Sequence, residues 1–241
     1  MDSAILFSAN AISCISKAKT ENHHTVISLL NHASLLQRDA RDFDLALKIC
    51  GKVLIMNSLK KDKDFKSSTD ETTLNLFNMG CIQKDKGDSR KAMTLFQDAI
   101  AQQIKLKFNQ RDNLLVVQVM LQMADLYEEA GMVTKVEETY KNAIRTLVGR
   151  FSKNHVEVAR LHHLFGQYYE RKHMYDDARF ELTEAYNIYK TNKAIHKSHP
   201  NIVMLERDLA DVKAIIVMQA SKDESLFGFK CFSCGDQKVV L

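Results

Sequence analysis

The hydrophobic and polar positions of this chain repeat one template of two short helices. In the first helix, large residues and a small residue come before a polar residue and the turn glycine. In the second helix, an alanine, a large residue and another alanine follow. The first clear copy consists of Leu76, Met79, Gly80, Gln83, Gly87, Ala92, Phe96 and Ala99. Apolar residues three and four apart share one face of a helix, so each half predicts an amphipathic helix. The glycine predicts the turn between them, because it adopts left-handed backbone conformations at little cost.

The template recurs on both sides of this copy. The next copies are Met120, Met123, Ala124, Tyr127, Gly131, Val136, Tyr140 and Ala143, and then His162, Phe165, Gly166, Tyr169, His173, Ala178, Leu182 and Ala185. A weaker upstream copy lacks the turn glycine and consists of Leu30, Ala33, Ser34, Gln37, Arg41, Ala46, Cys50 and Val53. Residues 201–219 repeat only the first-helix half, with Leu209 and Ala210 in the large and small positions, and predict a cap for the array.

A small residue marks the point where the two helices of each copy cross. These crossing residues are Ser34, Gly80, Ala124 and Gly166, at successive separations of 46, 44 and 42 residues. Antiparallel helices approach closely only where small residues meet, so we expect Gly80 to face Ala92 and Gly166 to face Ala178. The separations exceed the tetratricopeptide period of about 34 residues.

The long period, together with the His199-Pro200 turn before a first helix, resembles the kinesin light chain type of tetratricopeptide repeat. The proline suits the first turn of a helix, where no hydrogen bond is lost. The resemblance implies an all-α fold of helix-turn-helix repeats in a right-handed superhelical solenoid. It also implies a non-catalytic protein–protein interaction adaptor or scaffold that holds a peptide or helical segment in a concave groove.

The first helices are expected to line that groove. Within the resemblance, Asn78 occupies the position of an asparagine that contacts the backbone of a bound peptide. Gln122 places a longer amide in the same position, and Leu164 interrupts the series in the following copy. The candidate groove residues are Asn31, Phe77, Asn78, Cys81, Gln122, Asp125, His163, Gln167 and Arg207.

A second resemblance is to the tetratricopeptide repeat protein 19 family of mitochondrial factors associated with respiratory complex III. The residues that carry it are Asp112-Asn113-Leu114-Leu115-Val116-Val117 before Met123-Ala124-Asp125-Leu126-Tyr127, and His199-Pro200-Asn201-Ile202-Val203-Met204-Leu205 before Asp208-Leu209-Ala210. It implies an alternative function as a respiratory-complex assembly or stability factor, and an alternative mitochondrial location.

The sequence predicts three parts: an N-terminal helix over 1–20, a repeat array over 21–219 with about four helix pairs and a capping helix, and a tail over 220–241. A net charge of +4 without a long basic block does not indicate a nucleic-acid partner. No run of about 18 apolar residues predicts an integral membrane segment. Five scattered cysteines favour a reducing compartment, and hence the cytoplasm. Self-association stays open.

Motifs for phosphate binding, nucleophilic hydrolysis and zinc proteolysis are not found, so we expect neither an enzyme nor a bound cofactor. The adjacent pair His162-His163 is a poor ligand set, because neighbouring helical residues point in different directions. One metal-like signal is Cys231-Phe232-Ser233-Cys234, which supplies two of the four ligands of a closed zinc site. Alternative roles for Cys231 and Cys234 are a solvated or partner-buried tail, redox chemistry and lipidation.

Overall fold

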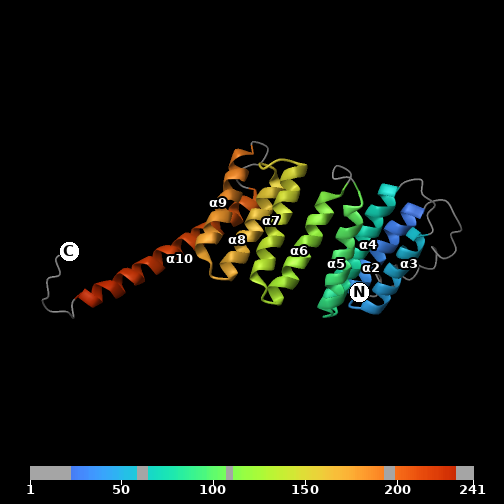
Figure 1. The fold of residues 1–241 in the computed structure, drawn as a ribbon, viewed down its shortest axis with the longest axis horizontal. Helices are drawn as coiled ribbons and strands as arrows, with labels where there is room; N and C mark the ends of the chain where they lie inside the picture. The colour runs from blue at the N-terminus through green and yellow to red at the C-terminus, as the bar shows by residue number, and fades with distance from the viewer. Residues whose placement is uncertain (1–22, 59–64, 107–110, 193–198, 232–241) are drawn as a thin grey trace. The chain divides into compact units, whose positions relative to one another are not determined.

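The computed structural model describes residues 23–58, 65–106, 111–192 and 199–231, and the side chains of 25–58, 69–106, 111–192 and 199–221. The predicted helix over 1–20 lies outside these residues. The helices are α2 (His23–Asp39), α3 (Phe43–Ser58), α4 (Phe65–Asp85), α5 (Ser89–Ile104), α6 (Asn113–Glu129), α7 (Val133–Arg150), α8 (Val156–Arg171), α9 (Tyr175–Thr191) and α10 (Pro200–Cys231) (Figure 1). The described residues contain no strand, and the all-α prediction is confirmed.

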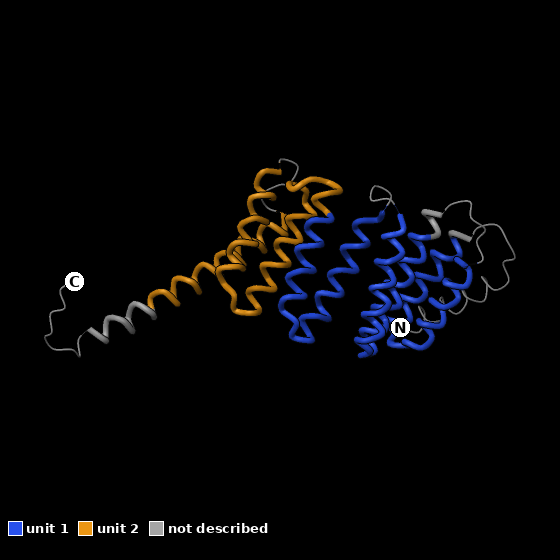
Figure 2. Tube along the Cα trace, in the orientation of Figure 1, with its two compact units in different colours: residues 1–146 blue, residues 147–241 orange. Residues whose placement is uncertain are grey.

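The chain forms two compact units, residues 1–146 and 147–241, which Figure 2 distinguishes by colour. In the first unit, α2 packs on α3 and α4 packs on α5, and successive pairs meet through α3 with α4 and α5 with α6. The first helices α2, α4 and α6 also contact one another in order. In the second unit, α8 packs on α9, and α10 packs on both. The weak upstream copy therefore forms a helix pair like the others.

Each first helix ends in the same left-handed turn. Its residue has a φ of 62° at Arg41, 89° at Gly87, 71° at Gly131 and 60° at His173. Two hydrogen bonds close each turn: the amide of Gly87 donates to the carbonyl of Lys84, and the amide of Asp88 donates to the carbonyl of Gln83. Equivalent bonds form in the other three copies. Such bonds satisfy carbonyls that the end of a helix leaves without partners.

The crossing glycines are required by close contact with the large residue of the second helix. A Cβ built on Gly166 would lie 2.7 Å from Cγ of Leu182, and one on Gly80 would overlap the ring of Phe96. The expected partners, Ala92 and Ala178, are fully buried one helical turn before these residues. The small residue of the first helix therefore accommodates the large residue of the second, and burying a side chain such as Phe96 contributes about 2 kcal/mol.

Helix α10 begins at Pro200 and continues to Cys231, whereas the sequence pattern placed the cap at residues 201–219. Its first half packs on the unit through residues that are less than one-tenth exposed, including Ile202, Leu205 and Val212. From Lys213 to Ser221 no side chain is buried. The helix therefore combines a packed half with a half that projects from α8 and α9.

Candidate functional site

Polar residues connect the first helices α2, α4 and α6 of the first unit. We call the surface formed by Arg38, Lys84, Asp85, Gln122 and Asp125 the first-helix surface. At its centre the ammonium group of Lys84 donates to Oδ2 of Asp125 at 2.8 Å and to Oε1 of Gln122 at 3.1 Å. The Lys84 side chain is 19% exposed and the Asp125 side chain is 46% exposed. Lys84 thus fixes Gln122 and Asp125 while leaving much of the Asp125 carboxylate accessible.

The same surface continues from α4 to α2 through a second ion pair. Nε of Arg38 donates to Oδ2 of Asp85, and both side chains are about one-third exposed. Arg38 and Lys84 occupy the same position of the template, four residues after the crossing residue. Their charged side chains bridge each first helix to the next.

Four predicted site residues lie deeper in this unit. Asn31, Asn78 and Cys81 are each about 5% exposed, and Phe77 is half-buried with its ring 6.1 Å from that of Phe96. Oδ1 of Asn31 is buried and has no hydrogen-bond partner among the described residues. Only small parts of Asn31 and Asn78 are accessible to a ligand.

Burial also makes the Cys81 thiol unreactive. The apolar surroundings raise the pKa of Cys81 to about 11, and the positive charge of Arg38 opposes this shift. At neutral pH the thiol is therefore protonated, whereas nucleophilic attack and metal binding require the thiolate. Cys81 belongs to the buried core beneath the first-helix surface.

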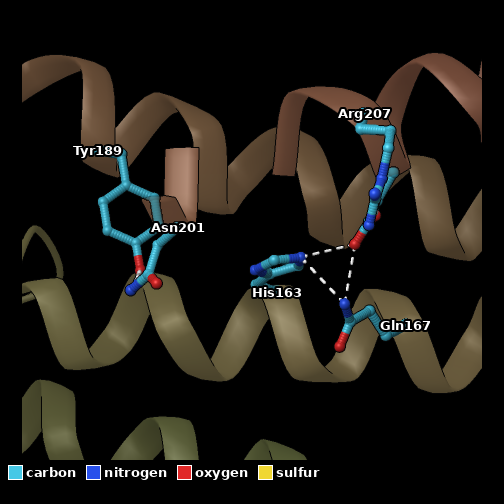
Figure 3. Close-up of polar contacts among 6 residues, drawn as sticks. His163, Gln167, Tyr189, Asn201 and Arg207 are labelled. Atoms are coloured by element: carbon cyan, nitrogen blue, oxygen red, sulfur yellow. Dashed lines mark hydrogen bonds and ion pairs between the residues drawn. The ribbon is translucent and has the colours of Figure 1, made fainter. Parts of the chain in front are cut away.

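In the second unit, one buried carboxylate gathers three predicted residues (Figure 3). Oδ2 of Asp208 lies 2.8 Å from Nε2 of His163 and accepts a hydrogen bond of 2.8 Å from Nε2 of Gln167. Arg207 is adjacent, with Nε 3.9 Å from the other oxygen of Asp208. Asp208 is 8% exposed and the Arg207 side chain 70% exposed, so the cluster is closed beneath and open at Arg207.

Glu170 places another carboxylate beside this cluster, where its negative charge is unfavourable. Burial raises the pKa of Glu170, and the negative charges of Asp208 and Asp211 raise it further. Arg171 and His163 partly offset the shift. The carboxylates of α8 and α10 therefore repel one another, and a cation at this surface would relieve the repulsion.

Asp208 and Arg38 also belong to these surfaces but were not among the residues predicted from the sequence. Asp208 lies two residues before the crossing position of its helix, as Asn78 and Gln122 do in theirs, so the template contained the signal. His162 and His163 point to different helices, as predicted: Nδ1 of His162 lies 2.6 Å from Oε2 of Glu181 on α9, while His163 contacts α10.

Within the part of the chain that the structure describes, no group of His, Cys, Asp or Glu side chains has the geometry to hold a metal ion. The side chain of Cys231 and the whole of Cys234 lie outside that part, so the C-x-x-C prediction stays untested. Among the described helices, none has the length and apolarity needed to cross a bilayer.

No family model and no curated protein matches the sequence. Among solved structures, the chain is similar to BtubC (BKLC) from P. vanneervenii, with a TM-score of 0.71 and 15% identity over 97% of this chain and 94% of that one. Two Podosopora anserina structures, described as kinesin light chain with nearly identical TPR-like repeats, give TM-scores of 0.62 and 0.60. Their identities are 13% and 14%, they cover 88% and 84% of this chain, and the chain covers 96% and 92% of theirs. The fold is a tetratricopeptide-like helical repeat of the long-period kind.

Proposed function

We propose that this chain is a non-catalytic scaffold that binds a peptide or helical segment of another protein on the first-helix surface. The observation that carries the proposal is the bridged row of Lys84, Gln122 and Asp125. Their donors and acceptors are fixed on rigid helices before any ligand arrives, so little conformational entropy is lost on binding.

The chemistry of this surface suits a polar or mixed segment. Nε2 of Gln122 donates to none of the described residues, and nearly half of the Asp125 side chain is exposed. An extended or helical peptide offers backbone carbonyls to the amide and an amide hydrogen or a cation to the carboxylate. Because Arg38, Asp85, Lys84 and Asp125 alternate in charge, the surface favours neither a strongly acidic nor a strongly basic ligand.

The test selects peptides from a phage-displayed library on the purified chain and measures the affinity of one selected peptide by fluorescence anisotropy. Replacing Gln122 with alanine should weaken this peptide about fivefold, because one hydrogen bond of about 1 kcal/mol is lost. Far-UV circular dichroism should show unchanged helix content.

The matched control is Gln118→Ala, which removes an exposed amide from the same helix α6. It should leave the affinity of the selected peptide unchanged. If the Gln122→Ala variant binds the peptide as tightly as the original chain does, the assignment of the first-helix surface is wrong.

A further inference from the structure

Helix α10 has the first-helix pattern of a repeat, but the residues that the structure describes cover only one of its two sides. The covered side packs on α8 and α9. It holds Ile202, Leu205, Leu209 and Val212, which are between 0% and 8% exposed. Ala210 occupies the crossing position. Ile202, Leu205 and Leu209 lie eight, five and one residues before it, and Val212 lies two residues after it. The same positions of α8 are buried as well.

The other side of α10 corresponds to the side of α8 that its second helix covers. In α8 this side consists of Ala159, His162, Gly166 and Tyr169, all buried or half-buried. Leu182 of α9 lies over Gly166, and Glu181 of α9 contacts His162. In α10 the equivalent residues are Val203, Glu206, Ala210 and Lys213, and every one is exposed.

Most side chains on this open side are small and apolar. Val203 is 54% exposed and Val217 is 67% exposed, and Ala210 and Ala214 lie between them. Glu206 and Lys213 add one charge of each sign. The helix continues for 21 residues from Ala210 to Cys231, or about 30 Å, so the chain does not turn back over this side there (Figure 1).

We propose that the open side of α10, formed by Val203, Glu206, Ala210, Lys213, Ala214 and Val217, binds a helix of a partner protein. The bound helix takes the place that a second helix holds in the other pairs. The interface continues one already present in the fold, since Gly80 and Gly166 occupy the position of Ala210 and are covered by Phe96 and Leu182. Ala210 leaves room above it for such a large apolar side chain.

The charges on α10 specify the partner further. In the α8 and α9 pair, a histidine of the first helix meets the Glu181 carboxylate of the second at 2.6 Å. Glu206 stands in the place of that histidine on α10, so the partner should carry a basic residue where α9 carries Glu181. The predicted partner is therefore an amphipathic helix with alanine, a large apolar residue and alanine on one face and lysine or arginine just before the large residue.

The experiment uses two fluorescent peptides of the α9 sequence, residues 175–191, one unchanged and one with Glu181→Lys. Their affinities for the full chain are measured by fluorescence anisotropy at low salt. The Glu181→Lys peptide should bind at least about tenfold more tightly than the unchanged peptide, because opposite charges attract where like charges repel. The chain variant Glu206→Lys should reverse this preference.

Two further variants show where the peptide binds. Ala210→Arg fills the crossing position and should abolish binding, whereas Ala220→Arg places the same side chain on exposed helix beyond the open side and should have no effect. Both residues are exposed, so both variants should keep the melting temperature of the original chain. Ala210 lies off the first-helix surface, so these variants should bind the library-selected peptide normally.

Three results would overturn the proposal. The first is that neither peptide binds saturably. The second is binding that Ala210→Arg leaves intact, because the peptide would then occupy another surface, such as the place of α9 itself. The third is a dimer in sedimentation velocity that Ala210→Arg dissociates, since a second copy of the chain would then cover the open side.

Discussion

The residues that end the first helices all have positive φ, but this conformation has a different energetic cost for glycine than for residues with a Cβ. Gly87 and Gly131 adopt positive φ without strain, whereas Arg41 and His173 hold φ values of 62° and 60° with a Cβ present. A left-handed conformation costs such residues roughly 1 kcal/mol. Tertiary packing of the helix pairs therefore compensates a local cost in the copies that lack the turn glycine.

Replacing Arg41 with glycine should remove this cost and raise the stability of the chain by about 0.5 to 1 kcal/mol, since the flexibility of glycine in the unfolded chain offsets part of the gain. The urea midpoint should rise with an unchanged slope. Lys48→Gly, at an exposed position inside α3, should instead lower the midpoint. A lower midpoint for Arg41→Gly would contradict the strain argument.

Glu170 should make the second unit less stable at neutral pH than at acidic pH. The pKa of Glu170 is higher in the folded chain than in the unfolded chain, so ionisation of Glu170 destabilises the folded chain. This loss of stability is complete above the pKa of the folded chain and absent below the pKa of the unfolded chain. Glu170→Gln should therefore raise the free energy of unfolding at pH 7, by less than about 1 kcal/mol for this partly exposed group. The gain should vanish as the pH falls to about 4.

The control for this prediction is Glu129→Gln, an exposed carboxylate at the end of α6. The difference between variant and original chain is compared at each pH, so that general acid effects cancel. A Glu170→Gln gain that persists unchanged at pH 4 would show that charge repulsion is not its cause.

At the scale of the helices, two glycines that look alike in the sequence have opposite roles. A Cβ on Gly166 would lie 2.7 Å from Leu182 and 3.3 Å from its backbone nitrogen, whereas a Cβ on Gly51 in α3 would meet nothing within 4 Å. Gly166 permits the contact between α8 and α9. Gly51 only weakens its helix.

Gly166→Ala should therefore lower the free energy of unfolding by about 1 to 3 kcal/mol through overpacking, and Gly51→Ala should raise it by about 0.5 to 1 kcal/mol through helix propensity. Chemical denaturation of the two variants measures both changes with the same substitution. Destabilisation by Gly51→Ala, or none by Gly166→Ala, would contradict this account of the crossing positions.

At the scale of the whole chain, the boundary between the two compact units lies within the repeat pattern, and no feature of the sequence marks it. The two compact units divide after Thr146, inside helix α7. Repeat arrays derive stability mainly from neighbouring elements, so damage in one unit need not unfold the other. The two units should therefore respond separately to a local defect.

Hydrogen exchange of the Gly166→Ala variant tests this independence. Amides of α8, α9 and the first half of α10 should lose protection, while those of α2 to α5 should keep it, because local stability follows local packing. The Gly51→Ala variant is the control and should leave the second unit unchanged. Equal loss of protection in all helices would show that the chain unfolds as one cooperative unit.

The local pattern of residues by itself determined the helices, the turns and the pairing of α2 with α3, α4 with α5 and α8 with α9. This was possible because periodicity, small crossing residues and left-handed turns act within about 20 residues. The same pattern placed Gln122, His163 and Gln167 among the candidate site residues, since template positions define helix faces.

Only the tertiary structure decided which of these residues are accessible and what they contact. Lys84 meets Gln122 and Asp125 across 38 and 41 residues, and His163 meets Asp208 across 45. Such contacts depend on how neighbouring helices stack, which a face assignment leaves open. The burial of Asn78 and the uncovered side of α10 follow from the same stacking, because exposure depends on what packs against a residue as well as on the residue itself.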